Sequence, residues 1–238
     1  MDADETALRR AQPLIAAGRF DDALQILARL LEDGDARLLS ALALVQSEAF
    51  PGALIEVERS IEMALEVAEA HALRSVVLLA MGRTKTALVA AQEAVRLGPS
   101  DPVAHEALAR AAIAARKRKV AELSANALLE LTPESVEAHS IAGTIALTWG
   151  SAKEAEAHFR QAIKADPTDA AAINDLALAL QRQGRSADAI RVFETAARSD
   201  PSLKVVLDNL YHETSLFVSG ARLGSTLNAY DRLSHPVA

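Results

Sequence analysis

The chain has 238 residues, of which 50% are hydrophobic and only 3% aromatic, and its formal net charge at pH 7 is −7. The acidic excess lies in residues 1–67, which contain six Lys and Arg residues against thirteen Asp and Glu, whereas the rest of the chain is neutral in sum. This distribution excludes an extended basic surface for nucleic acid, and the absence of cysteine excludes disulfides and thiolate metal sites.

Pairs of amphipathic helical stretches, each joined by a short turn, are predicted along the chain. They recur at the constant spacing of Pro99, Pro133, Pro167 and Pro201. Proline cannot continue a helix and pushes the preceding residue out of the α region, so each of these prolines ends a second helix. A period of about 34 residues is typical of helix-turn-helix solenoids. The predicted units within residues 1–203 are about 4–33, 34–67, 68–101, 102–135, 136–169 and 170–203.

The first two units depart from the regular pattern. The first begins a second helix at GRFDDALQIL, but the interval from Ala23 to Ala53 is shorter than that from Ala53 to Ala87. We attribute the difference to a shortened connection near Glu32–Asp35. The second unit carries Leu65 where the later units have proline.

The units share small residues, turn residues and helix caps. The small residues expected early in the second helices are Ala53, Ala87, Ala121, Ala155 and Ala189. The turn glycines are Gly82, Gly150 and Gly184, and unit 102–135 has Arg116 in their place. We expect Asp101, Ser135 and Asp169 to cap the first helices, and Phe159 and Phe193 to fill equivalent core positions.

The period fades beyond Pro201. Residues 204–218 are predicted as a helix with one apolar face, which would close the end of the array. Residues 219–238 contain Gly220 and Gly224, and they are interpreted either as a second capping helix or as a surface that docks elsewhere. The apolar residues of that surface are Leu223, Leu227, Tyr230 and Leu233.

Units 136–169 and 170–203 carry a small-residue, Gly, Ala, Phe and Pro pattern that resembles the tetratricopeptide repeat. The resemblance extends over residues of about 4–203. It implies an all-α, right-handed α-solenoid of about six such repeats, with a C-terminal capping segment at 204–238. It also implies that one face of each first helix lines a concave groove that binds a segment of another protein.

By this resemblance, the groove runs from an apolar N-terminal half to a polar C-terminal half. An apolar groove suits an apolar or amphipathic segment in the helix-in-groove mode. The predicted groove residues are Leu38, Leu42, Val45, Leu73, Val76, Leu79, Glu106, Arg110, Asn174, Asp175 and Asn209.

Family members that grip a C-terminal carboxylate use Lys, Arg and Asn at matching groove positions. Those positions here carry Leu38, Leu39, Ala72, Leu73, Glu106, Ala107, Ser140 and Ile141. The carboxylate clamp is therefore missing, which disfavours binding of a chaperone tail.

Three histidines, His71, His105 and His139, follow the same interval as the prolines. Equivalent positions in stacked helix pairs lie about 10 Å apart, whereas zinc ligands converge at about 2 Å from one ion. We therefore interpret these histidines as packing residues. The basic run at residues 116–119 is interpreted as a soluble turn, with electrostatic binding of a phosphate or an acidic peptide as the alternative.

No phosphate loop, nucleophile elbow or zinc-protease motif is found in the sequence, so we expect no catalytic activity, metal or cofactor. The acidic N-terminus and the lack of a membrane-spanning apolar run favour a cytoplasmic protein. The leading hypothesis is a non-catalytic scaffold or adaptor. The alternatives are homo-oligomerisation through residues 219–238, or the soluble N-terminal part of a larger, bacterial-type enzyme or membrane protein.

Overall fold

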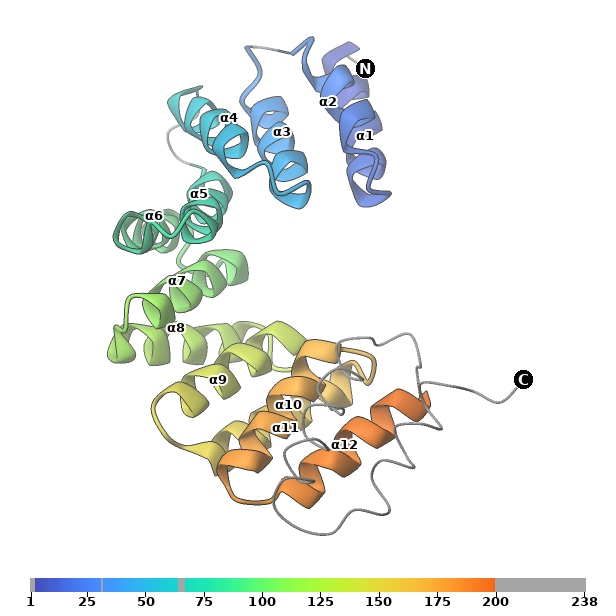
Figure 1. Cartoon of the computed structure of the whole chain (residues 1–238). Coiled ribbons are helices and arrows are strands. Elements are labelled where there is room, and N and C mark those ends of the chain that lie inside the picture. The colour runs from blue at the N-terminus through green and yellow to red at the C-terminus, as the bar shows by residue number, and fades with distance from the viewer. Residues whose placement is uncertain (1–2, 31, 64–66, 200–238) are drawn as a thin grey trace, which may run out of the picture. The chain divides into compact units, whose positions relative to one another are not determined.

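A computed structural model describes residues 3–30, 32–63 and 67–199. This part of the chain contains twelve α-helices and no β-strand, which confirms the predicted all-α fold (Figure 1). The predicted capping segment 204–238 lies outside the described residues. Asn209 and the proposed self-association residues Leu223, Leu227, Tyr230 and Leu233 fall there too.

The chain divides into two compact units, residues 1–127 and 128–238, and the division falls within one helix, α8. The helices that begin in the first unit are α1 Ala3–Ala16, α2 Phe20–Leu27, α3 Gly34–Gln46, α4 Phe50–Met63, α5 Ala68–Ala80, α6 Thr84–Leu97, α7 Pro102–Ala114 and α8 Arg118–Leu131. Those of the second unit are α9 Val136–Thr148, α10 Ala152–Ala165, α11 Ala170–Arg182 and α12 Ser186–Ser199.

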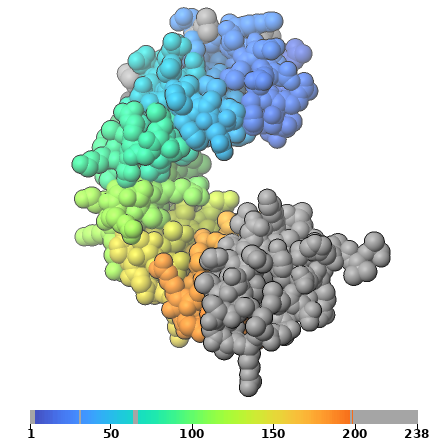
Figure 2. Space-filling model, in the orientation of Figure 1, coloured from blue at the N-terminus to red at the C-terminus, as the bar shows by residue number. Residues whose placement is uncertain are grey.

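From α1 to α7, and again from α9 to α12, each helix packs against the next helix along the chain. The first helices of successive pairs also contact one another, as α1 does with α3, α5 with α7, and α9 with α11. The space-filling view shows the N-terminal unit as a surface whose colour runs from blue to green (Figure 2). Because α1, α3, α5 and α7 contact one another in this order, the first helices of the N-terminal unit form a layer of their own.

One residue in each turn between paired helices has a left-handed backbone. The predicted glycines Gly82 and Gly184 have φ values of 72° and 75°, and Arg116 has a φ of 56° in the equivalent position. Glu48, at 60°, has the same role in the turn between α3 and α4. An L-residue is strained in this region, so both non-glycine turns are held by the helices on either side.

The expected caps are present at the starts of the first helices. Asp101 Oδ1 accepts a hydrogen bond from the backbone N–H of Val103 at 2.9 Å, and Asp169 Oδ1 accepts one from that of Ala171 at 2.9 Å. Ser135 Oγ accepts one from Ala138 at 3.3 Å. These bonds satisfy N–H groups that have no partner inside the helix.

Alanine is the main core residue where helices cross. The side chains of the predicted series are fully buried, namely Ala53, Ala87, Ala121, Ala155 and Ala189. Phe159 and Phe193 are buried in one cluster of the second unit, as their equivalent positions predict. A methyl group lets helix axes approach closely, which explains how a chain with few aromatic residues builds a dense core.

The irregularity of the first unit lies in a helix and not in a connection. Helix α2 has 8 residues, whereas α4, α6, α8, α10 and α12 have 14 each. The segment between Leu27 and Gly34 is not shortened, so the predicted short connection near Glu32–Asp35 is wrong. Asp33 instead caps α3 by accepting hydrogen bonds from Asp35 and Ala36.

Within the described ranges, no helix has both the length and the apolar character needed to cross a membrane.

Candidate functional site

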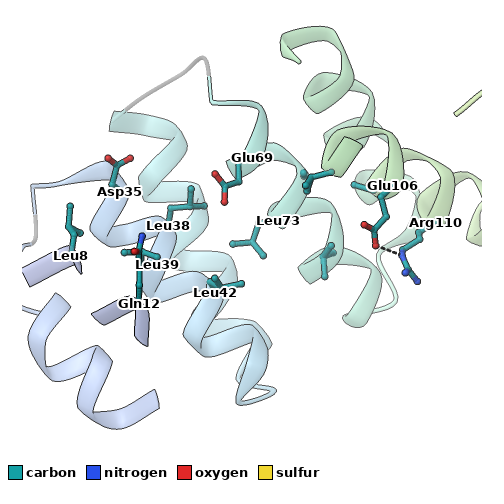
Figure 3. Close-up of a pocket in the computed structure, with 14 residues that line it drawn as sticks. Leu8, Gln12, Asp35, Leu38, Leu39, Leu42, Glu69, Leu73, Glu106 and Arg110 are labelled. Atoms are coloured by element: carbon teal, nitrogen blue, oxygen red, sulfur yellow. Dashed lines mark hydrogen bonds and ion pairs between the residues drawn. The ribbon is translucent and has the colours of Figure 1, made fainter. Parts of the chain in front are cut away.

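A groove of about 680 Å³ opens on the N-terminal unit (Figure 3). All of its lining residues come from the first helices α1, α3, α5 and α7, and none comes from a second helix. The lining consists of Leu8, Gln12, Asp35, Leu38, Leu39, Leu42, Glu69, Ala72, Leu73, Val76, Val103, Glu106, Ala107 and Arg110.

Helical periodicity brings these side chains to one face. On α3 the lining positions are 35, 38, 39 and 42, which is the i, i+3, i+4, i+7 spacing of one helix face. The equivalent positions of the next repeat line the groove from α5, and those of the repeat after it do so from α7. Because the repeats are equivalent, their faces add to one continuous lining.

The floor of the groove is apolar and partly exposed. Leu38 and Leu73 line it and also pack against the buried cluster of Ala41, Val57 and Ala70. One part of each side chain is therefore packed in the core, and the other part faces the groove. Val76 and Val103 are 38% and 52% exposed, which is unusual for large apolar side chains that lie together in a hollow.

The charges of the lining are mainly acidic. Asp35 and Glu69 are exposed, and neither carboxylate has a hydrogen bond or ion pair to any residue of the described ranges. Arg110, which is the cation of this lining, pairs with Glu106 through Nε and Oε1 at 2.9 Å. Two acidic charges therefore remain unbalanced along an apolar floor.

Six of the predicted groove residues line this groove, namely Leu38, Leu42, Leu73, Val76, Glu106 and Arg110. Val45 does not line it, and Leu79 packs instead against the core clusters around Leu78 and Ala107. Both lie beyond the face defined by the recurring positions, one turn closer to the end of their helices.

Asn174 and Asp175 lie on α11 of the second unit and do not line the groove. Asn174 Nδ2 donates to Asp175 Oδ1 at 3.4 Å. Burial raises the pKa of the Asp175 carboxyl above its ordinary value, and nearby Asp169 raises it further, while the Asn174 bond opposes both. Ionisation of the carboxyl group is therefore disfavoured in this position.

Sequence reasoning missed Leu8 and Gln12 of α1 and the first-turn residues Asp35, Glu69 and Val103. Asp35, Glu69 and Val103 are separated by one repeat each, so the repeat interval could have identified them as equivalent positions. Leu8 and Gln12 of α1 precede their equivalents in α3 by less than one full repeat, because the intervening helix α2 is short.

The second unit has a different hollow, of about 520 Å³, lined by residues of α10, α11 and α12 and the connections between them. Its floor includes the core residues Ile173 and Leu180. Its arginines are held by acids: Arg185 Nη1 pairs with Glu156 at 2.8 Å, and Arg191 pairs with Asp188. These pairs connect helices of the unit or turns of one helix, so the arginines have a structural role.

Two of the periodic histidines form hydrogen bonds to the backbone of the connections that precede their helices. His105 Nε2 lies 2.9 Å from the carbonyl oxygen of Pro99, and His139 Nε2 lies 3.0 Å from that of Pro133. The carbonyl only accepts, so each Nε2 carries the proton. Within the described ranges, no group of three or more His, Asp or Glu side chains could hold a metal ion.

One histidine contact was not foreseen. His139 Nδ1 lies 3.3 Å from His158 Nδ1, across α9 and α10. Because Nε2 of neutral His139 is protonated, its Nδ1 must accept, and His158 Nδ1 is the donor. Burial lowers the pKa of His158, and His139 lowers it further, although Glu154 opposes the change.

The basic run has the exposure that both of its interpretations need. Arg116, Lys117, Arg118 and Lys119 are all exposed. Arg118 Nε pairs with Glu122 Oε1 at 2.7 Å on the same helix.

The sequence matches family models described as tetratricopeptide repeat over residues 38–102, 106–170 and 146–205. These matches together span well over half of the chain. No curated protein matches the sequence.

Solved structures of the same fold include three that are similar over most of their length. TTC0263, a tetratricopeptide protein of Thermus thermophilus, is 23% identical with a TM-score of 0.65, covering 75% of this chain and 100% of that one. A tetratricopeptide repeat protein of Parabacteroides merdae is 15% identical with a TM-score of 0.66, covering 97% and 98%. YrrB, described as having an unusual peptide-binding site, is 19% identical with a TM-score of 0.54, covering 80% and 96%.

Proposed function

The chain belongs to the tetratricopeptide repeat family, and we propose that it is a non-catalytic scaffold or adaptor that binds a partner segment in the groove of its N-terminal unit. Proteins of this family generally act as protein-interaction scaffolds. The proposal involves no metal and no cofactor, and it assigns the affinity to apolar contacts. It includes a cytoplasmic location, which fractionation of cells would test.

The apolar floor of the groove is the observation that supports this proposal most. Leu42 and Val76 occupy equivalent positions on α3 and α5, and both line the hollow with partly open side chains. Full burial of an aliphatic side chain contributes about 1.5–3 kcal/mol. A few such contacts are enough for a specific, reversible complex once the ordering of the ligand is subtracted.

The polar groups of the lining argue against capture of the C-terminus of a partner. Leu39 and Ala72 occupy two of the positions where a carboxylate clamp needs Lys, Arg or Asn, and Arg110 is already paired with Glu106. A terminal carboxylate would meet Asp35 and Glu69 without a compensating cation. The groove therefore does not suit a segment that ends in a free C-terminal carboxylate.

The test is affinity capture followed by mass spectrometry, with the wild-type chain compared with Leu42→Glu and Val76→Glu variants. A charge placed on the apolar floor should abolish capture of any partner that binds there, because the charge must be desolvated. Circular dichroism should show unchanged helix content.

Ile55 and Val89 supply matched controls, since they are aliphatic residues of second helices, 52% and 65% exposed, and neither lines the groove. Their changes to Glu should leave capture intact. A partner retained by the groove variants but lost from these controls would place the binding surface on the second helices and overturn the proposal.

A further inference from the structure

We infer that the segment bound in this groove is an amphipathic α-helix with Lys or Arg residues about two turns apart along one border of its apolar face. The inference rests on the proposed function and names the chemistry of its partner. It is carried by the distribution of polar groups around the apolar floor.

The hydrogen-bonding needs of the bound backbone favour a helical ligand over an extended one. A buried peptide group without a hydrogen bond is costly, so an extended ligand needs donors and acceptors along its length. The floor positions here are Leu38, Leu39, Leu42, Leu73 and Val76, whose side chains offer none, and Gln12 is the one uncharged polar side chain among the lining residues. A helix satisfies its own backbone groups and presents only side chains to such a floor.

The charge of the partner follows from the acidic border. Asp35 and Glu69 occupy the same position on α3 and α5, so their carboxylates lie along one side of the groove, with Leu38 and Leu73 farther along the same helix faces (Figure 3). Neither has an ion-pair partner within the described ranges. Residues 1–67, which contain Asp35, also carry the acidic excess of the chain. A cationic border on the ligand complements this charge.

Helix capping alone does not account for these acids. The positive end of a helix dipole favours an acidic residue in the first turn, but it does so at any position around that turn. Asp33, not Asp35, caps α3, and its side chain accepts the hydrogen bonds there. The placement of Asp35 and Glu69 on the groove face is therefore an additional feature.

The spacing of the cations follows from the repeat. Equivalent positions on adjacent first helices lie roughly 10 Å apart, which is the diameter of a helix. Residues seven apart on a ligand helix are separated by about 10.5 Å along its axis. A ligand helix that crosses α3 and α5 therefore places Lys or Arg at i and i+7 opposite Asp35 and Glu69.

The experiment uses the full chain and three labelled synthetic helical peptides of about 20 residues, long enough to cross three helices. The peptides share one Leu-rich face and carry Lys, Gln or Glu at two border positions seven apart. Fluorescence anisotropy gives Kd for each at low and at high salt. We expect the Lys peptide to bind at least about tenfold more tightly than the Glu peptide at low salt, with a smaller ratio at high salt.

Variants separate the charge effect from the groove itself. In the Asp35→Asn, Glu69→Gln double variant, the Lys-to-Glu preference should fall towards one while the Gln peptide keeps its affinity. The matched control removes two exposed acids of second helices, Asp21→Asn and Glu62→Gln, which changes the net charge equally and should leave the preference intact. An equal loss in the control would assign the preference to net charge and overturn the inference.

Two further outcomes distinguish this inference from the proposed function. If all three peptides bind equally and Leu42→Glu abolishes binding, the groove binds helices and the inferred charge preference is wrong. If the Lys peptide binds equally well to Leu42→Glu, the groove is not its site and both proposals fail for this ligand. If no peptide binds, the inferred partner chemistry is overturned, and the capture experiment still decides the proposed function.

Discussion

The ring of Phe159 lies where a side chain at Gly143 would have to be. A Cβ atom built on Gly143 would be 2.6 Å from Phe159 Cε1 and 2.8 Å from Cδ1, much closer than van der Waals contact. Phe159 is fully buried, so its ring can move only by displacing its core neighbours. Helices α9 and α10 thus approach closely because residue 143 lacks a side chain.

We expect Gly143→Ala to destabilise the second unit. Alanine favours a helix over glycine by about 1 kcal/mol, but overpacking a dense core costs about 1–3 kcal/mol. Since the contact is with a fully buried ring, the steric cost should exceed the helix gain, and the midpoint of urea unfolding should fall.

The control for this prediction is the same change in a Phe159→Leu background. There the clash is relieved, and alanine should be neutral or stabilising, so the two sites should be strongly coupled in a double-mutant cycle. Equal effects in both backgrounds would mean that the ring does not limit residue 143.

Replacing Arg116 with glycine should stabilise the chain. Arg116 has a φ of 56° and an exposed side chain, so the change relieves backbone strain without removing buried contacts. Relief of a left-handed residue is worth about 1–2 kcal/mol, and the added freedom of the unfolded chain takes back about 0.4–1 kcal/mol. Thermal unfolding followed by circular dichroism should show a higher Tm.

Gly82→Ala provides the opposite case. Gly82 has a φ of 72°, and a Cβ there would meet no atom within 4 Å, so any loss of stability comes from the backbone alone. A lower Tm for Gly82→Ala, together with a higher Tm for Arg116→Gly, is the expected pair of results. Two changes in the same direction would contradict the argument from φ.

His158 should make the second unit sensitive to mild acid. Its pKa is lowered below the ordinary value of 6.5, mainly by burial and then by His139. The unfolded chain therefore binds a proton at His158 more readily than the folded chain does. The contribution to stability is present above pH 6.5 and is lost as the pH falls from 6.5 through the lowered pKa.

Denaturation with urea at a series of pH values would check this prediction. The stability of the wild type should fall more steeply between neutral pH and pH 5 than that of His158→Gln, which cannot be protonated there. Parallel curves for the two proteins would show that protonation of His158 is not coupled to folding.

Asp175→Asn should stabilise the chain at neutral pH. Burial raises the pKa of Asp175 above its ordinary value of 3.8, so the folded chain binds a proton there more readily than the unfolded chain. The ionised carboxylate is therefore unfavourable at pH 7, and this penalty disappears as the pH falls towards 3.8. The increase in Tm should be largest at pH 7 and should shrink in acid; an increase that is independent of pH would point to another cause.

Local patterns account for much of what was predicted from the sequence. Proline stops, Asp and Ser caps and turn residues act within a few residues of their own position, so Pro133, Asp169 and Gly184 are readable without knowledge of the fold. The buried series that includes Ala87 and Ala155 was readable for a different reason, since a repeat places equivalent residues in equivalent surroundings. Six residues that line the groove were named through the resemblance to the tetratricopeptide repeat, which assigns one face of each first helix to a groove.

The lining of the groove was only partly predictable, because exposure depends on what the neighbouring helices cover. Leu73 and Leu79 are both leucines of α5 that pack against core clusters, but of the two only Leu73 also lines the hollow. Leu8 of α1 also lines the groove, but the constant repeat interval did not identify it, because the short helix α2 reduces the spacing between the first two repeats. Such differences are set by packing between helices, which a one-dimensional period does not contain.

The sequence by itself determined the all-α fold, the helix pairs and the regular positions of their caps and turns, because these depend on local backbone chemistry repeated at a constant interval. Only the tertiary structure decided that His139 meets His158, that Gly143 admits the ring of Phe159, and that Asp35 and Glu69 border one apolar groove. Each of these depends on the distance between side chains of different helices, and that distance is set by how the helices pack.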